Sequence, residues 1–213
     1  MKYFALLFLL VTLPVQDSFY ARLSDAALSL TKDHVTYIGD YVKIPYPNGD
    51  VPKNTGVCTD VIIRAYRKLG IDLQKEVHED MKANFSKYPK NWGLKSTDTN
   101  IDHRRVPNLQ TFFSRKGTSL PVTKNAADYK PGDIVTWMIT PSLPHIGIVV
   151  NKKTKDGKRY MIVHNVGRGR NWKIACSCMT YPGITAIKNK SYIAVLSAST
   201  ACHSGCSVIY LAT

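Results

Sequence analysis

Three short strand-like runs follow one another late in this chain, after a series of helical patterns. The first, Ile134 to Trp137, follows the turn sequence Pro131-Gly132-Asp133; the second is His145 to Val150 and the third is Met161 to His164. Lys155-Asp156-Gly157-Lys158 predicts a hairpin turn between the last two runs. Helices first and consecutive strands later predict an α+β fold, with helices packed on an antiparallel sheet.

Four helical segments are expected ahead of this sheet. They run from about Ala21 to Lys32, from Cys58 to a C-cap at Gly70, from Leu73 to Phe85, and from Val106 to Arg115. A loop rich in Pro, Gly and Asn leads through Thr55 to the second of them. With 213 residues the chain has the size of one domain, large enough for a hydrophobic core without disulfides.

The N-terminus has the layout of a secretory signal peptide. Met-Lys-Tyr is followed by an apolar run from Phe4 to Val15, which is too short to span a bilayer, and then by a polar stretch. We expect residues 1–21 to be the signal peptide, although Phe19-Tyr20-Ala21 is not a small-x-small cleavage triplet. The alternative is an N-terminal core helix. Export predicts a periplasmic or secreted protein with no membrane span once the signal is removed.

The chain is strongly basic, with a formal net charge of +14 and a sequence pI near 9.6. In an exported protein such a charge favours contact with envelope polyanions, or it only keeps the domain soluble. The sequence contains no RNA-binding signature and no zinc-finger spacing, so we expect no nucleic-acid partner.

Cys58 and two histidines are the residues with the clearest chemical potential. A cysteine at a helix N-terminus beside a histidine can have its pKa lowered from about 8.5 to roughly 3.5–7.5, which makes it a nucleophile. His145 and His164 lie on neighbouring predicted strands, where side chains facing the same side are about 5 Å apart and can touch. The alternatives are a buried apolar Cys58, a His145 that caps a strand edge, and a His164 hydrogen-bonded in the core.

Several other polar residues are candidates for substrate binding: Asp60, His103, Arg104, Arg105 and Asn165. Asp60 lies in the first turn of its helix, where a carboxylate is stabilising by about 0.3–1 kcal/mol and can also influence the thiol. Asn165 is an alternative to His164 as the residue that orients the base. The arginines suit carboxylates, although such a run is also typical of a solvated face. We expect Trp92 and Trp137 to belong to the core rather than to sugar-binding platforms.

Five motifs carry a resemblance to a known family. They are Thr55-Gly-Val-Cys-Thr-Asp60, Val77-His-Glu-Asp-Met-Lys82, Asn100-Ile-Asp-His-Arg-Arg-Val-Pro-Asn108, Pro131-Gly-Asp and Leu143-Pro-His-Ile-Gly-Ile148. From about residue 41 to 167 the chain resembles the bacterial domain-of-unknown-function family 1287. That family resembles in turn the NlpC-type papain-like cysteine peptidases, which cut peptidoglycan stem peptides in the bacterial envelope.

The resemblance implies one papain-like domain over residues 22–187. It further implies Cys58 as the nucleophile, His145 as the general base and His164 as the orienting residue, with no cofactor and no metal. The expected protein is a monomeric, exported thiol amidase or peptidase that acts on peptidoglycan or another envelope polymer. A non-catalytic envelope-binding module on the same fold and a thiol acyl transferase are the alternatives.

The C-terminal part departs from this family. No acidic residue follows Asp156, and four of the five cysteines, Cys176, Cys178, Cys202 and Cys206, fall there. The resemblance implies an ending of the type Leu-Glu-Asp-x-Leu-Phe, followed by a strand closing in Gly-His-Tyr-Arg-Tyr. We back-translated the sequence from Asn171 onward and read the codons two nucleotides out of frame. In that frame Leu-Glu is obligatory, and most of the family ending is compatible with the codons.

We therefore expect a frameshift between about Gly167 and Asn171, either genuine or from sequencing, so that residues 167–213 are a doubtful segment. Arg168, Arg170, Lys173, Lys188 and Lys190 then inflate the apparent basicity. The cysteine cluster, which otherwise suggests a metal site or two disulfides, is explained without a function. Resequencing the locus tests this: an intact frame, with no family-like peptide in the other frame, refutes it.

Overall fold

The computed structural model describes residues 18–166 together with the strand segments 173–175 and 185–188. The helices are α1 (Phe19–Leu30), α2 (Cys58–Lys68), α3 (Leu73–Ala83) and α4 (Val106–Lys116), with short 3-10 turns at Phe85–Lys87, Asn91–Gly93, Asp102–Arg104 and Ala126–Asp128. The strands are β1 (Thr36–Tyr37), β2 (Thr55–Gly56), β3 (Thr118–Leu120), β4 (Ile134–Thr140), β5 (Leu143–Lys153), β6 (Tyr160–His164), β7 (Lys173–Ala175) and β8 (Thr185–Lys188). The predicted α+β class is confirmed.

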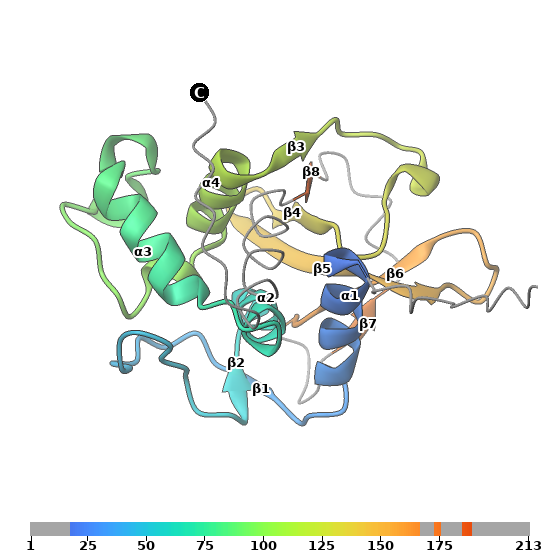
Figure 1. Cartoon of the computed structure of the whole chain (residues 1–213), viewed down its shortest axis with the longest axis horizontal. Helices are drawn as coiled ribbons and strands as arrows, with labels where there is room; N and C mark the ends of the chain where they lie inside the picture. The colour runs from blue at the N-terminus through green and yellow to red at the C-terminus, as the bar shows by residue number, and fades with distance from the viewer. Residues whose placement is uncertain (1–17, 167–172, 176–184, 189–213) are drawn as a thin grey trace, which may run out of the picture.

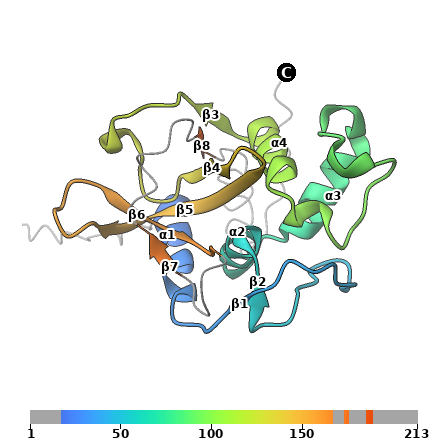
Figure 2. The same cartoon turned by 180° about the vertical axis from the view of Figure 1, so that it is seen from behind.

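The main sheet has the strand order β3-β8-β4-β5-β6-β7, and every neighbouring pair is antiparallel. β5 lies in its middle, between β4 and β6, and the β5–β6 hairpin projects from one end of the molecule (Figure 1). Gly157 takes a φ of +70° in that hairpin, where the sequence predicts the turn. β1 and β2 form a separate parallel pair beside the start of α2 (Figure 2).

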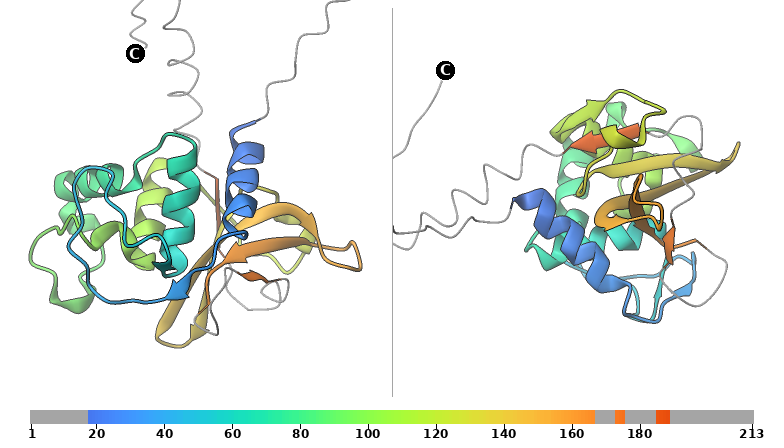
Figure 3. Two further views of the ribbon diagram at one scale, coloured as in Figure 1. Left: turned by 90° about the horizontal axis from the view of Figure 1, so that it is seen from below. Right: turned by 90° about the vertical axis from the view of Figure 1, so that its right-hand side faces the viewer.

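The helices gather on one side of this sheet (Figure 3). Alternate residues of β5, among them Ile146 and Ile148, join the core that α1, α2 and α4 build on that side. Val149 points the other way and joins a second buried cluster that includes Val135 and Trp137. The sheet is therefore buried on both faces around β5, and a side chain on either face is shielded from water.

Local signals explain where α2 and α3 begin and end. The Asp60 carboxylate accepts a hydrogen bond from the Val57 backbone N–H at 2.6 Å, which satisfies a donor at the start of α2. Gly70, with a φ of +81°, follows the end of α2, as expected of a C-terminal glycine. Asp72 caps α3 by accepting from the backbone N–H groups of Gln74 and Lys75. The four predicted helices agree with α1 to α4 to within two residues at each end.

Helix α1 begins inside the segment that the sequence assigns to the signal peptide. Ser18 is its N-cap, with its hydroxyl oxygen accepting from the Ala21 backbone N–H at 3.2 Å, and Phe19 is buried in the core. Tyr20 packs so closely against Gly132 that a Cβ at that glycine would lie 2.6 Å from the Tyr20 side chain. Gly132 also has a φ of +88°, so the Pro131-Gly132 turn needs glycine for two reasons.

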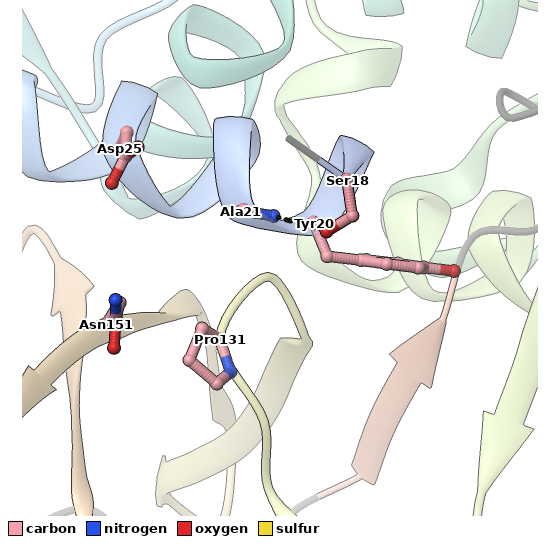
Figure 4. Close-up of a pocket in the computed structure, with 6 residues that line it drawn as sticks. All are labelled: Ser18, Tyr20, Ala21, Asp25, Pro131 and Asn151. Carbon is pink, nitrogen blue, oxygen red and sulfur yellow. Dashed lines mark hydrogen bonds between the residues drawn. The ribbon is translucent and has the colours of Figure 1, made fainter. Parts of the chain in front are cut away.

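Figure 4 shows this docking of α1 against the Pro131 turn and β5. A cavity of about 330 Å³ lies there, lined by Ser18, Tyr20, Ala21, Asp25, Pro131 and Asn151. None of the helices in the described part of the chain combines the length and the apolar character needed to cross a membrane. Most of the predicted signal peptide, residues 1–17, lies outside the described residues.

Candidate active site

Cys58 is the first residue of α2 and lies in the core with 5% of its surface exposed. Burial raises the pKa of its thiol to about 12, against a weaker lowering effect of a hydrogen bond from the Ile146 backbone N–H. The backbone N–H groups of Thr59 and Cys58 itself also lower the pKa, but less. The lowered pKa expected from the sequence is therefore wrong for the resting protein, because desolvation outweighs the helix N-terminus.

His145 on β5 and His164 on β6 form a buried pair. His145 Nε2 lies 3.0 Å from His164 Nδ1, and the two ring planes are nearly perpendicular at 87°. Burial lowers the pKa of His145 to about 3, assisted by the neighbouring His164, and lowers that of His164 to about 4. Both imidazoles are thus neutral near pH 7. The contact expected from adjacent strands is present.

Trp137 packs against both histidine rings. It lies directly opposite His145 in the β4–β5 register, and its ring centroid is 4.7 Å from that of His145 and 5.3 Å from that of His164. Trp137 is buried, as the sequence analysis expects of a core residue. The indole fixes the orientation of both imidazoles and excludes water from them.

The peptide between His145 and Ile146 is the link between the thiol and the histidine pair. The Ile146 N–H interacts with Cys58 Sγ, so the sulfur lies at the backbone next to His145. Within the described residues, however, the structure has no hydrogen bond between the Cys58 thiol and a His145 nitrogen. Because His145 Nε2 is engaged with His164, Nδ1 is the nitrogen of His145 that remains for a proton from the thiol.

Asn165 connects the histidine strand to the cysteine helix. It is fully buried, and its Nδ2 donates to the Gly56 carbonyl at 3.1 Å, two residues before Cys58. Tyr37 pairs with Gly56 in the β1–β2 ladder and also lies beside the site. Burial raises the pKa of Tyr37 to about 12, and the charges of Cys58 and Asp60 contribute to the increase.

Asp60 and Arg104, both predicted to bind substrate, form a buried ion pair with each other. Arg104 Nε and Nη2 donate to the two carboxylate oxygens at 2.9 and 3.0 Å, and both residues are almost fully buried. The Thr59 hydroxyl donates to the Arg104 carbonyl at 3.0 Å, which fastens the same segment to the first turn of α2. The two carboxylate oxygens of Asp60 are thus occupied by Arg104, with the Val57 N–H as a further donor, whereas Arg104 Nη1 is buried without an acceptor among the described residues. The substrate-binding role of both residues stays a prediction.

The rest of the predicted polar cluster divides between the interior and the surface. His103 is buried, and desolvation followed by the charge of Arg104 lowers its pKa to about 3. Arg105 is half-buried, and its guanidinium lies over the ring of Trp92, 4.5 Å from the ring centroid. The prediction that Trp92 is a core residue is wrong, because 61% of its surface is exposed.

The described residues contain no group of three His, Cys, Asp or Glu side chains suited to hold a metal ion. The candidate metal or disulfide residues Cys176, Cys178, Cys202 and Cys206 lie outside the described residues. Two further cavities of the described part are lined by residues of α1 and α2 and, for one of them, of the loop before β2; neither includes Cys58 or the histidine pair.

Sequence reasoning missed Tyr37 and the Ile146 amide as neighbours of the thiol. No sequence signal points to Tyr37, since a two-residue strand leaves no periodicity. The Trp137–His145 contact was predictable in principle: pairing the runs of the β4–β5 hairpin in antiparallel register places these two residues opposite each other.

The chain is similar to one protein family, to one curated protein and to two solved structures. The sequence profile of the family described as "Domain of unknown function (DUF1287)" matches residues 24–181. The uncharacterized protein YijF of Escherichia coli K12 is 45% identical over 167 residues, which is 75% of this chain and 81% of YijF. Two solved structures of an N-acetylmuramoyl-L-alanine amidase from Bacteroides uniformis align with TM-scores of 0.46 and 0.45, at 13% and 11% identity, over 80% and 79% of this chain and 98% of theirs.

Proposed function

Since the chain belongs to the DUF1287 family, whose function is unknown, we propose its activity from its own site: it is a thiol hydrolase of the amidase or peptidase type. The observation that carries this proposal is the buried His145–His164 pair joined through one peptide to the Cys58 thiol. A nucleophile, a base and an orienting group that follow one another in space are the components of a cysteine hydrolase site. The order of these elements, helix then two neighbouring strands, also supports a papain-like fold of the NlpC type for a single domain.

In this mechanism Cys58 Sγ attacks an amide carbonyl of the substrate while His145 Nδ1 takes the thiol proton. In the tautomer that this step requires, His145 Nε2–H donates to His164 Nδ1 and His145 Nδ1 is unprotonated; the 3.0 Å contact between the two nitrogens is compatible with it. The tetrahedral intermediate collapses as the imidazolium of His145 gives its proton to the leaving amine. Water then hydrolyses the thioester, with His145 acting as base again, and regenerates the thiol.

Backbone N–H groups supply the electrostatic stabilisation. The Cys58 N–H at the start of α2 faces the developing oxyanion, where a donor of this kind contributes about 10²–10³-fold to the rate. Because the resting thiol is neutral and its pKa is raised, the thiolate forms only as the proton moves to His145. The two neutral groups therefore act together rather than as a preformed ion pair.

The substrate we propose is the stem peptide of peptidoglycan, on which the protein would act in the periplasm or outside the cell. The resemblance of the Cys58, Pro131-Gly132-Asp133 and His145 motifs to the NlpC-type peptidases supports this choice. The chain also stays basic without the five cations of the doubtful segment, with a formal charge of +9 instead of +14, which suits an anionic wall polymer. No cofactor takes part in the proposed chemistry.

One observation favours a second candidate, a non-catalytic envelope-binding module on the same fold. Cys58 is 5% exposed and, among the described residues, makes no hydrogen bond with His145, as a retained but inactive site would look. Trapping the thioester distinguishes the two. A stem-peptide ester should add its acyl mass to Cys58 in the wild-type protein and not in Cys58→Ala, while the four tail cysteines serve as internal controls. Absence of the adduct, with sacculus binding unaffected by Cys58→Ala, selects the binding module.

A further inference from the structure

Trp92 and Arg105 form an exposed aromatic and cationic surface that the mechanism does not use. Trp92 lies in the Asn91–Gly93 turn, with a left-handed φ of 66° and 61% of its surface exposed. The Arg105 guanidinium lies over the indole, with its Cζ 4.5 Å from the ring centroid, which is a cation–π contact. An exposed indole with a guanidinium over one face offers a ligand an apolar contact and a charge side by side.

The charge of Arg105 is unmatched within the described part of the chain. Arg64, Arg67, Arg104 and Arg115 each hold an aspartate there, whereas Arg105 makes no side-chain hydrogen bond or ion pair. The charge of Arg105 acts on Asp102, but no hydrogen bond joins the two side chains: Asp102 Oδ2 accepts from the Asp98 backbone N–H and Oδ1 has no partner among the described residues. One guanidinium nitrogen, Nη1, is buried without an acceptor, so the guanidinium lacks the anion that its fork geometry favours.

The backbone at Arg105 is connected to the first turn of α2, the helix that begins with the proposed nucleophile. Arg105 directly follows Arg104, whose carbonyl accepts from Thr59 and whose guanidinium holds Asp60, the two residues after Cys58. Residues 104 and 105 are thus fastened to the first turn of α2. An extended peptide with its scissile bond at Cys58 can reach the Arg105 guanidinium within a few residues, since each residue spans about 3.3–3.6 Å.

We propose that Trp92 and Arg105 form a subsite for a free carboxylate of an acidic peptide substrate, with the indole packing against the aliphatic part of the same residue. The subsite deepens the proposed function, on which it rests for the identity of the peptide. Of the three predicted contact residues His103, Arg104 and Arg105, only Arg105 belongs to this subsite. Trp92, which the sequence predicts to be a core residue, is its second member.

Binding and hydrolysis are measured separately to test this. Calorimetric titration of Cys58→Ala protein uses two probes, a stem-type tetrapeptide with free carboxylates and the same peptide with its carboxylates converted to amides. Arg105→Ala, added to Cys58→Ala, should weaken binding of the free acid about tenfold and leave the weaker amide unchanged, because a charge-assisted contact is lost. Trp92→Ala, added to Cys58→Ala, should weaken binding of both peptides, because it removes an apolar contact that both can make. Arg105→Lys should recover only part of the loss, since it keeps the charge without the fork.

Arg159→Ala is the matched control, because Arg159 is also half-buried and belongs to the β5–β6 hairpin at the other end of the molecule from the connection between α3 and α4 (Figure 1). It should not change binding of either peptide. Equal affinity for the acid and the amide, or no effect of Arg105→Ala, overturns the subsite even if the wild-type protein hydrolyses the peptide. Carboxylate-dependent binding that requires Arg105, without hydrolysis, supports the subsite and overturns the hydrolase.

Discussion

His145 Nε2 lies 3.0 Å from His164 Nδ1, so His164 determines which nitrogen of His145 faces away from the pair. The pair is buried between adjacent strands and packed against Trp137, which leaves neither ring free to turn. The proposed chemistry depends on this arrangement, because only an unprotonated His145 Nδ1 can accept the thiol proton.

The two histidines should therefore differ in their kinetic effects. We expect His145→Ala to lower kcat by about 10²–10⁴-fold, since it removes the base. His164→Asn should lower kcat by much less, because its amide can still accept the His145 N–H, whereas His164→Ala should approach the effect of His145→Ala. Steady-state kinetics on a stem peptide check this. Equal, small effects of all three variants would contradict the assigned roles.

The pH dependence follows from the shifted pKa values. The base must be neutral, and the pKa of His145 is lowered to about 3, so kcat/KM should remain level as the pH falls from 7 to 5. The thiol has its pKa raised to about 12, so the alkaline limb should also be absent below pH 9. An ordinary histidine would lose half of the activity near pH 6.5. A half-loss at that pH would show that His145 is not the base in this environment.

Alkylation gives an independent view of the thiol. Reaction of Cys58 with iodoacetamide should be slow at pH 7 and should rise through pH 9 without a plateau, because the thiolate is the reactive form. Peptide mass mapping separates Cys58 from the other cysteines. A plateau reached below pH 7 would indicate a preformed thiolate and would contradict the neutral resting site.

The Asp60–Arg104 pair should be structural. Asp60→Ala or Arg104→Ala alone leaves an uncompensated buried charge and should lower the free energy of unfolding by about 3–5 kcal/mol. Replacing both residues with Leu should lower the free energy of unfolding far less. About 1 kcal/mol of that smaller loss comes from the Val57 N–H, which loses its acceptor. Denaturant unfolding of the single and double variants tests this coupling. Additive losses would contradict a buried pair in which each charge compensates the other.

Residues 18–21 should belong to the folded domain. A chain that begins at Arg22 lacks the Ser18 cap and the buried Phe19, and removal of a buried phenylalanine side chain costs about 3–5 kcal/mol. A chain that begins at Ser18 should unfold at a clearly higher temperature than one that begins at Arg22. Phe19→Ala in the longer chain controls for the core contact alone. Equal melting temperatures would place the domain boundary after Ala21, as the sequence analysis does.

Regular patterns made much of this fold predictable. The helices α1 to α4 and the strands around His145 and His164 carry amphipathic or apolar runs with clear turn and cap residues, which is local information. The contact between the two histidines follows from pairing neighbouring strands. The family to which the chain belongs was also identifiable from its motifs.

What the sequence could not provide are properties that depend on long-range packing. The pKa of Cys58 is set by the sheet that covers it, so the helix N-terminus alone predicted the wrong direction. Arg104 and Asp60 are separated by 44 residues, so nothing local indicates that each satisfies the other. Trp92 is exposed because its turn projects it outward, while the apolar character of the residue suggested burial.

The most direct test of the proposed activity is mass spectrometry of muropeptides released from purified peptidoglycan. Two forms of the protein are incubated with it, one with the present sequence and one with the reading frame restored beyond residue 167. The Cys58→Ala variant of each form is the control. We predict new products that depend on Cys58 and whose masses identify the amide bond that is cut. An unchanged product profile for both forms, or the same products from Cys58→Ala, would contradict a cysteine hydrolase.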